Sequence, residues 1–370
     1  MGTIDLECHR TVSRDRSSGL VLTVKYGSLA PFLCRSDSNL AHPTHFLRKA
    51  SMPSQPVNLP ALIALLVSIA TPTFMSTAQA LGVPQTMVAT QTMVASRPAA
   101  QPLIQAQAGG LDRLLKQGSD LLDDDKPDQA LDIFKQVLSA DANNVDALIG
   151  QGTAFYYLKQ YEGAIAAYKR ATAVDPRSIA GWVGLGNALD DTKQSEAALK
   201  AYDKALAIDT NDANVWYNRG VTLGRLQRYQ EEVAAYDKAV RLRPTYGSAW
   251  YNRGIVLTKL ERTAEALASY DQAVKLDPDR VNAWINRGNV QFDLKRYQDA
   301  VKSYDRAIAL EPNSEDAWFN RGVTLANLKR YQDAIAAFNK TLKINPNNAD
   351  ARKNRDSLLK RVEQLNQEAS

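Results

Sequence analysis

A glycine recurs every 34 residues along most of this chain, and this spacing limits the fold more than any other feature of the sequence. Seven glycines keep the interval without a slip: Gly118, Gly152, Gly186, Gly220, Gly254, Gly288 and Gly322. Before the last four, the sequence reads "VWYNRG", "AWYNRG", "AWINRG" and "AWFNRG". A fixed period of this length indicates a stack of similar supersecondary units rather than one closed core.

Other positions of the unit keep the same period when each unit is numbered from the equivalent of Leu111. Position 20 is small in six of the seven units, position 24 is always Phe or Tyr, and position 32 is proline in five. Glycine at position 8 costs about 1 kcal/mol in mid-helix, so a neighbouring helix is expected to approach closely there. Proline at position 32 ends a helix. Each unit is therefore predicted to be two antiparallel helices.

The period and these positions resemble the tetratricopeptide repeat family. The resemblance covers Leu111 to Asn348 as seven units: 111–144, 145–178, 179–212, 213–246, 247–280, 281–314 and 315–348. It implies an all-α, right-handed superhelical solenoid, closed by a capping helix and tail over residues 349–370. Glu232 at a small-residue position and Gln291 at an apolar one depart from the pattern, so local loosening is expected in the fourth and sixth units.

Arginine at position 7 of a unit accompanies aspartate at position 25 of the unit before it. In the family the first helix of one unit packs on the second helix of the preceding unit. We therefore predict a ladder of ion pairs across the unit boundaries: Asp203–Arg219, Asp237–Arg253, Asp271–Arg287 and Asp305–Arg321. Duplication of an ancestral unit without any contact is the alternative explanation.

The resemblance also implies a concave groove lined by the first helices. Asparagine at position 6 often binds the backbone of a peptide in this family; bonding to a nearby main-chain group is the alternative. The candidate groove residues are Tyr217, Asn218, Val221, Arg225, Tyr251, Asn252, Ile255, Lys259, Ile285, Asn286, Asn289, Phe319 and Asn320. Aromatic and aliphatic side chains with occasional cations suit an extended or helical peptide. The arrangement with which some family members grip a C-terminal carboxylate is not intact.

No catalytic, cofactor or metal site is expected, and the chain is predicted not to be an enzyme. All cysteines and histidines lie in the first fifty residues. Identical Asn–Arg pairs spaced along a solenoid do not converge on one point, as catalytic groups must. The Gly-x-Gly at Gly184 lacks a third glycine and a preceding strand, and the acidic run that starts at Asp123 falls at a predicted turn.

The charge of the repeat region argues against a nucleic-acid partner. Residues 1–110 hold 8 Lys+Arg against 4 Asp+Glu, whereas residues 111–370 hold 37 against 36. Without a basic face, a protein or peptide is the expected partner of a scaffold or assembly factor, with the oligomeric state left open. An accessory module of a polysaccharide-export or glycosyl-transfer system is the alternative. Sugar binding calls for exposed tryptophan on the groove, yet all five tryptophans fall at the predicted packing position 4.

The N-terminal segment is interpreted as a targeting region. Residues 52–80 resemble a signal peptide, with an apolar run from Leu59 to Ala70 and Ala78-Gln79-Ala80 as the cleavage pattern. The mature chain is then expected to begin at Leu81 and to act in the periplasm, a lumen or the extracellular space. An uncleaved anchor, the only expected membrane contact, is the alternative. Residues 1–51 are either an over-extended gene start or a further targeting segment. Residues 81–110 are expected to form a disordered linker.

Overall fold

The computed structural model describes the backbone of residues 13–14, 21–22 and 100–369, and the side chains of residues 109–368. Two short strands, β1 (Ser13–Arg14) and β2 (Val21–Leu22), pair antiparallel, with Ser13 opposite Leu22. The predicted signal peptide, residues 52–80, lies outside the described residues, as do residues 81–99 of the predicted linker.

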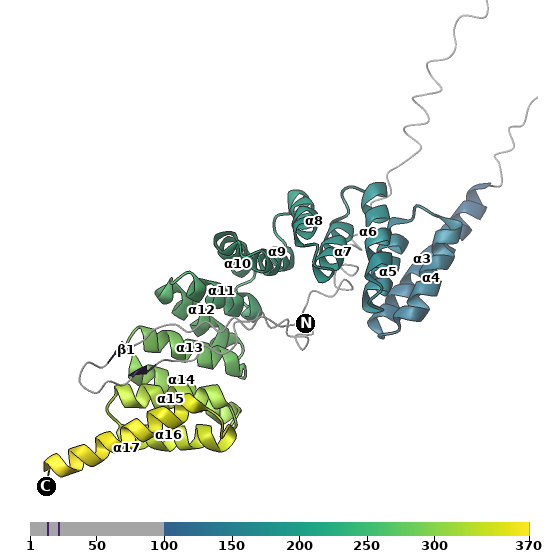
Figure 1. Cartoon of the computed structure of the whole chain (residues 1–370). Coiled ribbons are helices and arrows are strands. Elements are labelled where there is room, and N and C mark those ends of the chain that lie inside the picture. Colours follow the sequence, from purple (N-terminus) through teal and green to yellow (C-terminus); the bar gives the residue numbers. More distant parts are fainter. Residues whose placement is uncertain (1–12, 15–20, 23–99, 370) are drawn as a thin grey trace, which may run out of the picture. The chain divides into compact units, whose positions relative to one another are not determined.

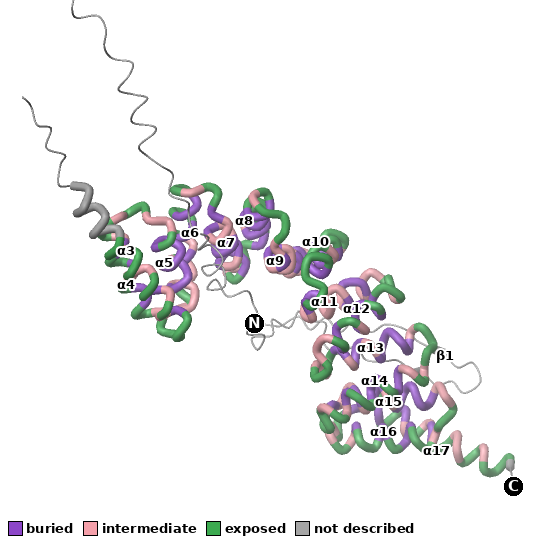
Figure 2. The backbone as a smooth tube through the Cα atoms, turned by 180° about the vertical axis from the view of Figure 1, so that it is seen from behind, coloured by how far each residue is buried: buried purple, intermediate pink, exposed green. Residues whose placement is uncertain are grey.

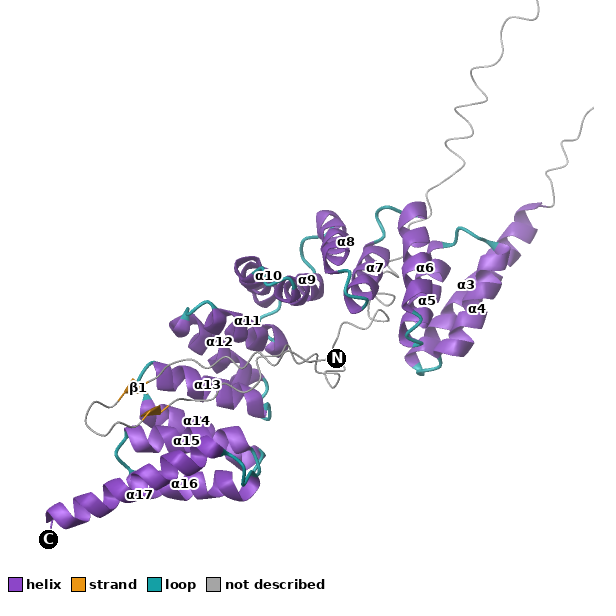
Figure 3. Ribbon diagram, in the orientation of Figure 1, coloured by secondary structure: helices purple, strands orange, loops and turns teal. Residues whose placement is uncertain are grey.

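Helices follow one another from residue 100 to residue 369 (Figure 1, Figure 3). Residues 41–160 contain α3 (Ala100–Asp123), α4 (Pro127–Ala140) and α5 (Val145–Tyr157). The part from residue 161 contains α6 (Tyr161–Val174), α7 (Ile179–Asp191), α8 (Ser195–Ile208), α9 (Ala213–Arg225), α10 (Tyr229–Leu242), α11 (Gly247–Lys259), α12 (Thr263–Leu276), α13 (Val281–Asp293), α14 (Tyr297–Leu310), α15 (Glu315–Asn327), α16 (Tyr331–Ile344) and α17 (Ala349–Ala369).

Within each of the two parts, every helix packs on the next one along the chain. From the third unit onward, α7/α8, α9/α10, α11/α12, α13/α14 and α15/α16 are the predicted pairs, and α17 follows as the capping helix. Ala351 and Leu358 of α17 are buried against the last unit. The prediction of an all-α solenoid of antiparallel helix pairs is confirmed.

Helix α3 corrects the predicted boundary of the disordered linker. It begins at Ala100, so the backbone of residues 100–110 is helical rather than irregular. The segment "AQPLIQAQAGG" contains Ala, Gln and Leu, which have high helix propensity. Its proline stands in the first turn, where the missing N–H is tolerated.

The recurring glycines receive the aromatic ring of their own unit. A Cβ atom at Gly254, for example, would lie 2.7 Å from Cε1 of Tyr270. The same close contact occurs at Gly118–Phe134, Gly186–Tyr202, Gly220–Tyr236, Gly288–Tyr304 and Gly322–Phe338. These rings are almost fully buried, and Figure 2 shows the buried stretches on the inner sides of the helices. The cost of a mid-helix glycine is thus offset by the aromatic side chain that it admits.

The turn inside each unit has a left-handed residue that is never glycine. Position 15 has φ between 58° and 62° in all seven units: Asp125, Lys159, Lys193, Gln227, Glu261, Lys295 and Lys329. The next amide N–H bonds the carbonyl five residues earlier, as Gln194 N does to Leu189 O at 2.8 Å. This is the hydrogen bond that closes a helix in a Schellman motif.

Candidate functional site

All four predicted ion pairs are in contact across the unit boundaries. The Nε–Oδ1 distance is 2.9 Å for Arg219–Asp203 and 2.6 Å for Arg253–Asp237, Arg287–Asp271 and Arg321–Asp305. Each arginine stands on the first helix of a unit and each aspartate on the second helix of the unit before it. We call this row of pairs, with the tryptophans beside it, the ladder edge.

The tryptophans complete the ladder edge. The indole N–H of Trp250 donates to the carbonyl of Pro244 at 2.9 Å, and the other four bond the equivalent position-32 carbonyl at 2.8–3.0 Å. The arginine of the same unit lies over the ring, with its Cζ 5.8 Å from the ring centroid for Arg253 over Trp250. The rings are half-buried. Each tryptophan therefore joins its unit to the preceding turn, and Trp216, Trp250, Trp284 and Trp318 also stack on the ladder arginine of their unit.

The position-6 asparagines bond to side chains of the preceding unit. Asn218 donates to Asn187 at 3.0 Å, and Asn187 also accepts from the hydroxyl of Tyr202 at 2.8 Å. Asn320, Asn289 and Tyr304 repeat this arrangement at 3.0 and 2.8 Å.

The other two position-6 asparagines bond to tyrosine hydroxyls. Asn252 donates to Tyr217 at 3.1 Å and Asn286 donates to Tyr251 at 3.4 Å. Asn218, Asn286 and Asn320 are buried. These amides bind side chains of the solenoid rather than the main-chain group considered from sequence.

The predicted groove residues fall into two groups. Tyr217, Val221, Tyr251 and Ile255 of the fourth and fifth units are half-buried on α9 and α11, and all four pack against the same apolar cluster. We call these four residues the groove strip. The predicted groove also included residues of the sixth and seventh units, and the structure corrects this part of the prediction.

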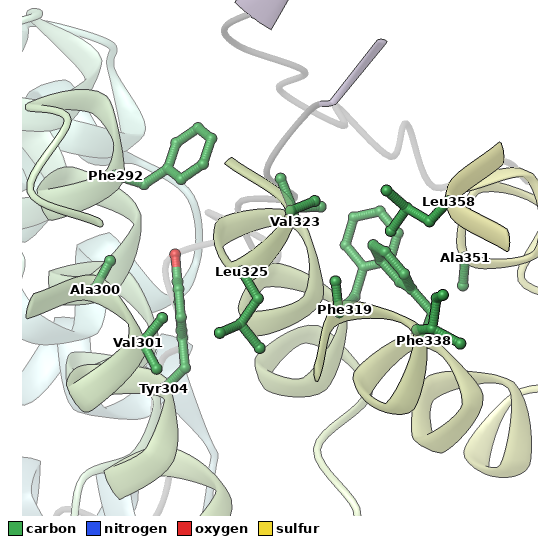
Figure 4. Close-up of a cluster of buried hydrophobic side chains, with 13 residues drawn as sticks. Phe292, Ala300, Val301, Tyr304, Phe319, Val323, Leu325, Phe338, Ala351 and Leu358 are labelled. Atoms are coloured by element: carbon green, nitrogen blue, oxygen red, sulfur yellow. The ribbon is translucent and has the colours of Figure 1, made fainter. Parts of the chain in front are cut away.

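Ile285, Asn289 and Phe319 are buried rather than lining an open surface. Ile285 packs with Ala307 and Ala317. The Phe319 ring lies edge-on against Phe338 at 5.7 Å, beside Leu358 of α17 (Figure 4). The last unit uses this position to hold the capping helix.

The two tyrosines of the groove strip are held in fixed positions. The Tyr217 ring lies 4.9 Å from Tyr246, and the Tyr251 ring lies 6.1 Å from Tyr270. The Arg280 guanidinium lies 5.1 Å from the Tyr251 ring centroid. Both hydroxyls accept the asparagine hydrogen bonds described above. An ordered aromatic surface loses little entropy on binding.

The predicted groove cations have internal partners. Arg225 Nη1 lies 3.0 Å from Asp190 Oδ2 and donates to the Asp190 carbonyl at 2.7 Å. Burial raises the pKa of Asp190, while Arg225 and the Ser195 hydroxyl act to lower it. The Lys259 ammonium lies 5.2 Å from the centroid of the Tyr229 ring. Arg225 is therefore not available as a free cation, contrary to the prediction.

The two residues that departed from the repeat pattern are buried in unbroken helices. Gln291 accepts from the hydroxyl of Ser303 at 2.7 Å, whereas its Nε2 has no partner. Glu232 is 7% exposed, and its Oε2 also has no partner. Burial raises the pKa of Glu232 to about 7, against the effects of Lys259 and Tyr236. The burial of the Asp190 and Glu232 carboxyl groups beside the groove was not predicted from the sequence, although Gly224 next to Glu232 was a readable signal.

Neither a metal cluster nor a membrane-crossing helix occurs in the described part of the chain. Side chains 109–368 contain no group of three or more His, Cys, Asp or Glu residues arranged to hold a metal. None of the described helices combines the length and apolar character needed to span a bilayer.

A family model described as tetratricopeptide repeat matches the chain in six overlapping windows: residues 115–179, 149–213, 183–247, 217–281, 251–315 and 285–349. The chain belongs to the tetratricopeptide repeat (TPR) family. Its solenoid is a TPR scaffold of the protein-interaction class, a fold that is typically not catalytic. No curated protein matches the sequence.

Two solved structures illustrate the likeness. YrrB, described as a TPR protein with an unusual peptide-binding site, is 26% identical, with a TM-score of 0.50 over 52% of this chain and 100% of YrrB. The C-terminal part of a TPR protein from Cytophaga hutchinsonii is 16% identical, with a TM-score of 0.56 over 65% of this chain and 98% of its own. The second likeness shows the fold alone.

Proposed function

We propose that this TPR protein binds a peptide segment of a partner protein on the groove strip of the fourth and fifth units. The observation that carries the proposal is the half-exposed row of Tyr217, Val221, Tyr251 and Ile255. The four equivalent side chains of the sixth and seventh units are all buried: Ile285, Asn289, Phe319 and Val323. Aromatic anchors of this kind dominate the energy of many interfaces. The peptide-binding site described for YrrB supports a similar use of this fold.

The test is a capture experiment with the full chain. Tyr251→Ala is expected to weaken binding of every captured protein by about 1–3 kcal/mol, because it removes a central anchor. Leu242→Ala is the matched control, since Leu242 is 38% exposed on the second helix of the fourth unit. Unfolding curves of both variants separate loss of binding from loss of structure. Equal binding by Tyr251→Ala and the wild type excludes the groove strip.

We propose further that the protein acts outside the cytoplasm. The support is the apolar run Leu59–Ala70 followed by the small residues of a cleavage site. N-terminal sequencing of the native protein is expected to give Leu81. A native chain that still contains residues 59–80 contradicts cleavage and supports the anchored alternative, and a chain recovered only from the cytoplasm contradicts export.

A further inference from the structure

Two successive unit boundaries each place a buried carboxyl group near a cation of the next unit. At the first, Asp190 at the end of α7 faces Arg225 at the end of α9. Arg225 Nη1 lies 3.0 Å from Oδ2, and the Ser195 hydroxyl donates to Oδ1 at 3.2 Å. Both oxygens of this carboxyl group therefore have partners, one of them a guanidinium.

At the second boundary the carboxyl group comes from the other helix of the pair. Gly224 occupies the position that Asp190 has in the preceding unit, and Glu232 of α10 reaches it from the second helix. A Cβ atom at Gly224 would lie 2.8 Å from Glu232 Oε1, so the missing side chain makes room for the carboxyl group. The other six units have alanine at the Glu232 position, and none has glycine at the Gly224 position.

The cation at this boundary does not complete the pair. Lys259 stands where Arg225 stands one unit earlier, but its ammonium lies over the Tyr229 ring at 5.2 Å. Glu232 Oε2 is buried without a partner in the described part of the chain. The Tyr236 hydroxyl hydrogen-bonds the carboxyl group, but a buried carboxylate with one oxygen left unpartnered is still costly, and burial raises the pKa of Glu232.

We propose that the Glu232 carboxylate is a subsite for a guanidinium or ammonium group of the bound peptide. The peptide cation takes the role beside Glu232 that Arg225 has beside Asp190. This inference rests on the proposed function and adds a specificity to it: a basic residue in the segment that lies on the groove strip.

The position of Glu232 fits this role. Its chain neighbour Val233 belongs to the apolar cluster against which the groove strip packs. The charge of Glu232 also acts on Tyr236, which Tyr217 contacts with a ring distance of 5.8 Å. A peptide on the strip therefore runs beside the carboxyl group. A charged hydrogen bond in such a site is stronger than a neutral one.

The experiment uses the full chain and two small probes, N-acetyl-arginine amide and its neutral counterpart N-acetyl-citrulline amide, titrated by NMR. The arginine probe is expected to bind at least about tenfold more tightly than the citrulline probe. Glu232→Gln is expected to abolish this preference. The matched control is Glu231→Gln, because Glu231 is an exposed carboxylate already paired with Arg228 at 2.7 Å. Equal binding of the two probes, or a preference that survives in Glu232→Gln, overturns the proposal.

The variant Lys259→Met tests whether Glu232 serves a ligand or only the internal cation Lys259. The Lys259 ammonium competes with the cation of a ligand for Glu232, so this variant is expected to bind the arginine probe several-fold more tightly. Weaker binding of the probe by Lys259→Met contradicts the proposal. The arginine preference tests the subsite alone, whereas loss of partner capture in Tyr251→Ala tests the groove strip. Either result can fail without the other.

Discussion

The arginines and tryptophans of the ladder edge lie on the first helices of the units, as the groove strip does, but the two surfaces differ in how strictly they repeat. At four boundaries the ladder edge has the same Asp–Arg pair, with the arginine stacked on the same tryptophan. The groove side changes from unit to unit: Tyr217 and Tyr251 become Ile285 and Phe319. A contact that stacks similar units can be the same at successive boundaries, whereas a surface that recognises one partner has no need to repeat. The variable side is therefore where specificity can reside.

The largest expected effect is a loss of stability, and it compares two adjacent residues: Trp250 on the ladder edge and Tyr251 on the groove strip. Trp250→Ala removes the bond to Pro244 and the ring under Arg253, and it is expected to lower the free energy of unfolding by about 3 kcal/mol. Tyr251→Ala removes a half-buried ring and is expected to cost about 1–2 kcal/mol. Urea unfolding of both full-chain variants measures the difference. Equal losses indicate that the groove strip is a packing surface like the ladder edge.

The next effect concerns the pH dependence of stability that comes from Glu232. The folded-state pKa of Glu232 is raised from 4.5 to about 7, so the folded protein holds this proton more tightly than the unfolded chain. Its favourable contribution is complete below about pH 4.5 and is lost as the pH rises through about 7. The stability of the wild type relative to Glu232→Gln is expected to fall by about 2–3 kcal/mol over this range.

Comparison with Glu232→Gln isolates this group, because Asp146 and Asp190 also have raised pKa values. Chemical denaturation at a series of pH values measures the effect. If the difference in free energy of unfolding between the wild type and Glu232→Gln stays constant from pH 4.5 to 7.5, Glu232 is ionised throughout this range. The groove side then contains a paired carboxylate, as the ladder edge does.

What could be predicted from the sequence follows the same division. The Asp–Arg pairing could be predicted because aspartate occurs in the third to sixth units and arginine in the fourth to seventh. This offset by one unit indicated that each arginine pairs with the aspartate of the preceding unit. The fate of Ile285 and Phe319 was not readable, because their burial depends on the helices that cover them and not on their position in the unit. The position-6 asparagines stayed ambiguous, since their partners, Asn187 and Tyr217 among them, vary between units.

The smallest expected effect is the coupling within one step of the ladder. Arg253 and Asp237 are joined at 2.6 Å, with 14% and 35% of their side chains exposed. Arg330 and Asp333 are also joined at 2.6 Å, but they lie three residues apart on one turn, with 54% and 49% exposed. Because solvent screens the second pair more, a double-mutant cycle is expected to give about 1 kcal/mol for the ladder pair and about 0.3 kcal/mol for the control.

The two cycles also decide what the repetition of the ladder means. If the coupling energy of Asp237 and Arg253 exceeds that of Arg330 and Asp333, the recurring Asp and Arg stabilise the stacking of units. Arg253 also donates to Ser269 at 2.6 Å, so the alanine variants are best compared with Arg253→Lys, which keeps the charge and loses the fork of donors. Additive losses in the Asp237–Arg253 cycle contradict an energetic role. The ladder is then a remnant of unit duplication, and its strict repetition no longer distinguishes it from the groove side.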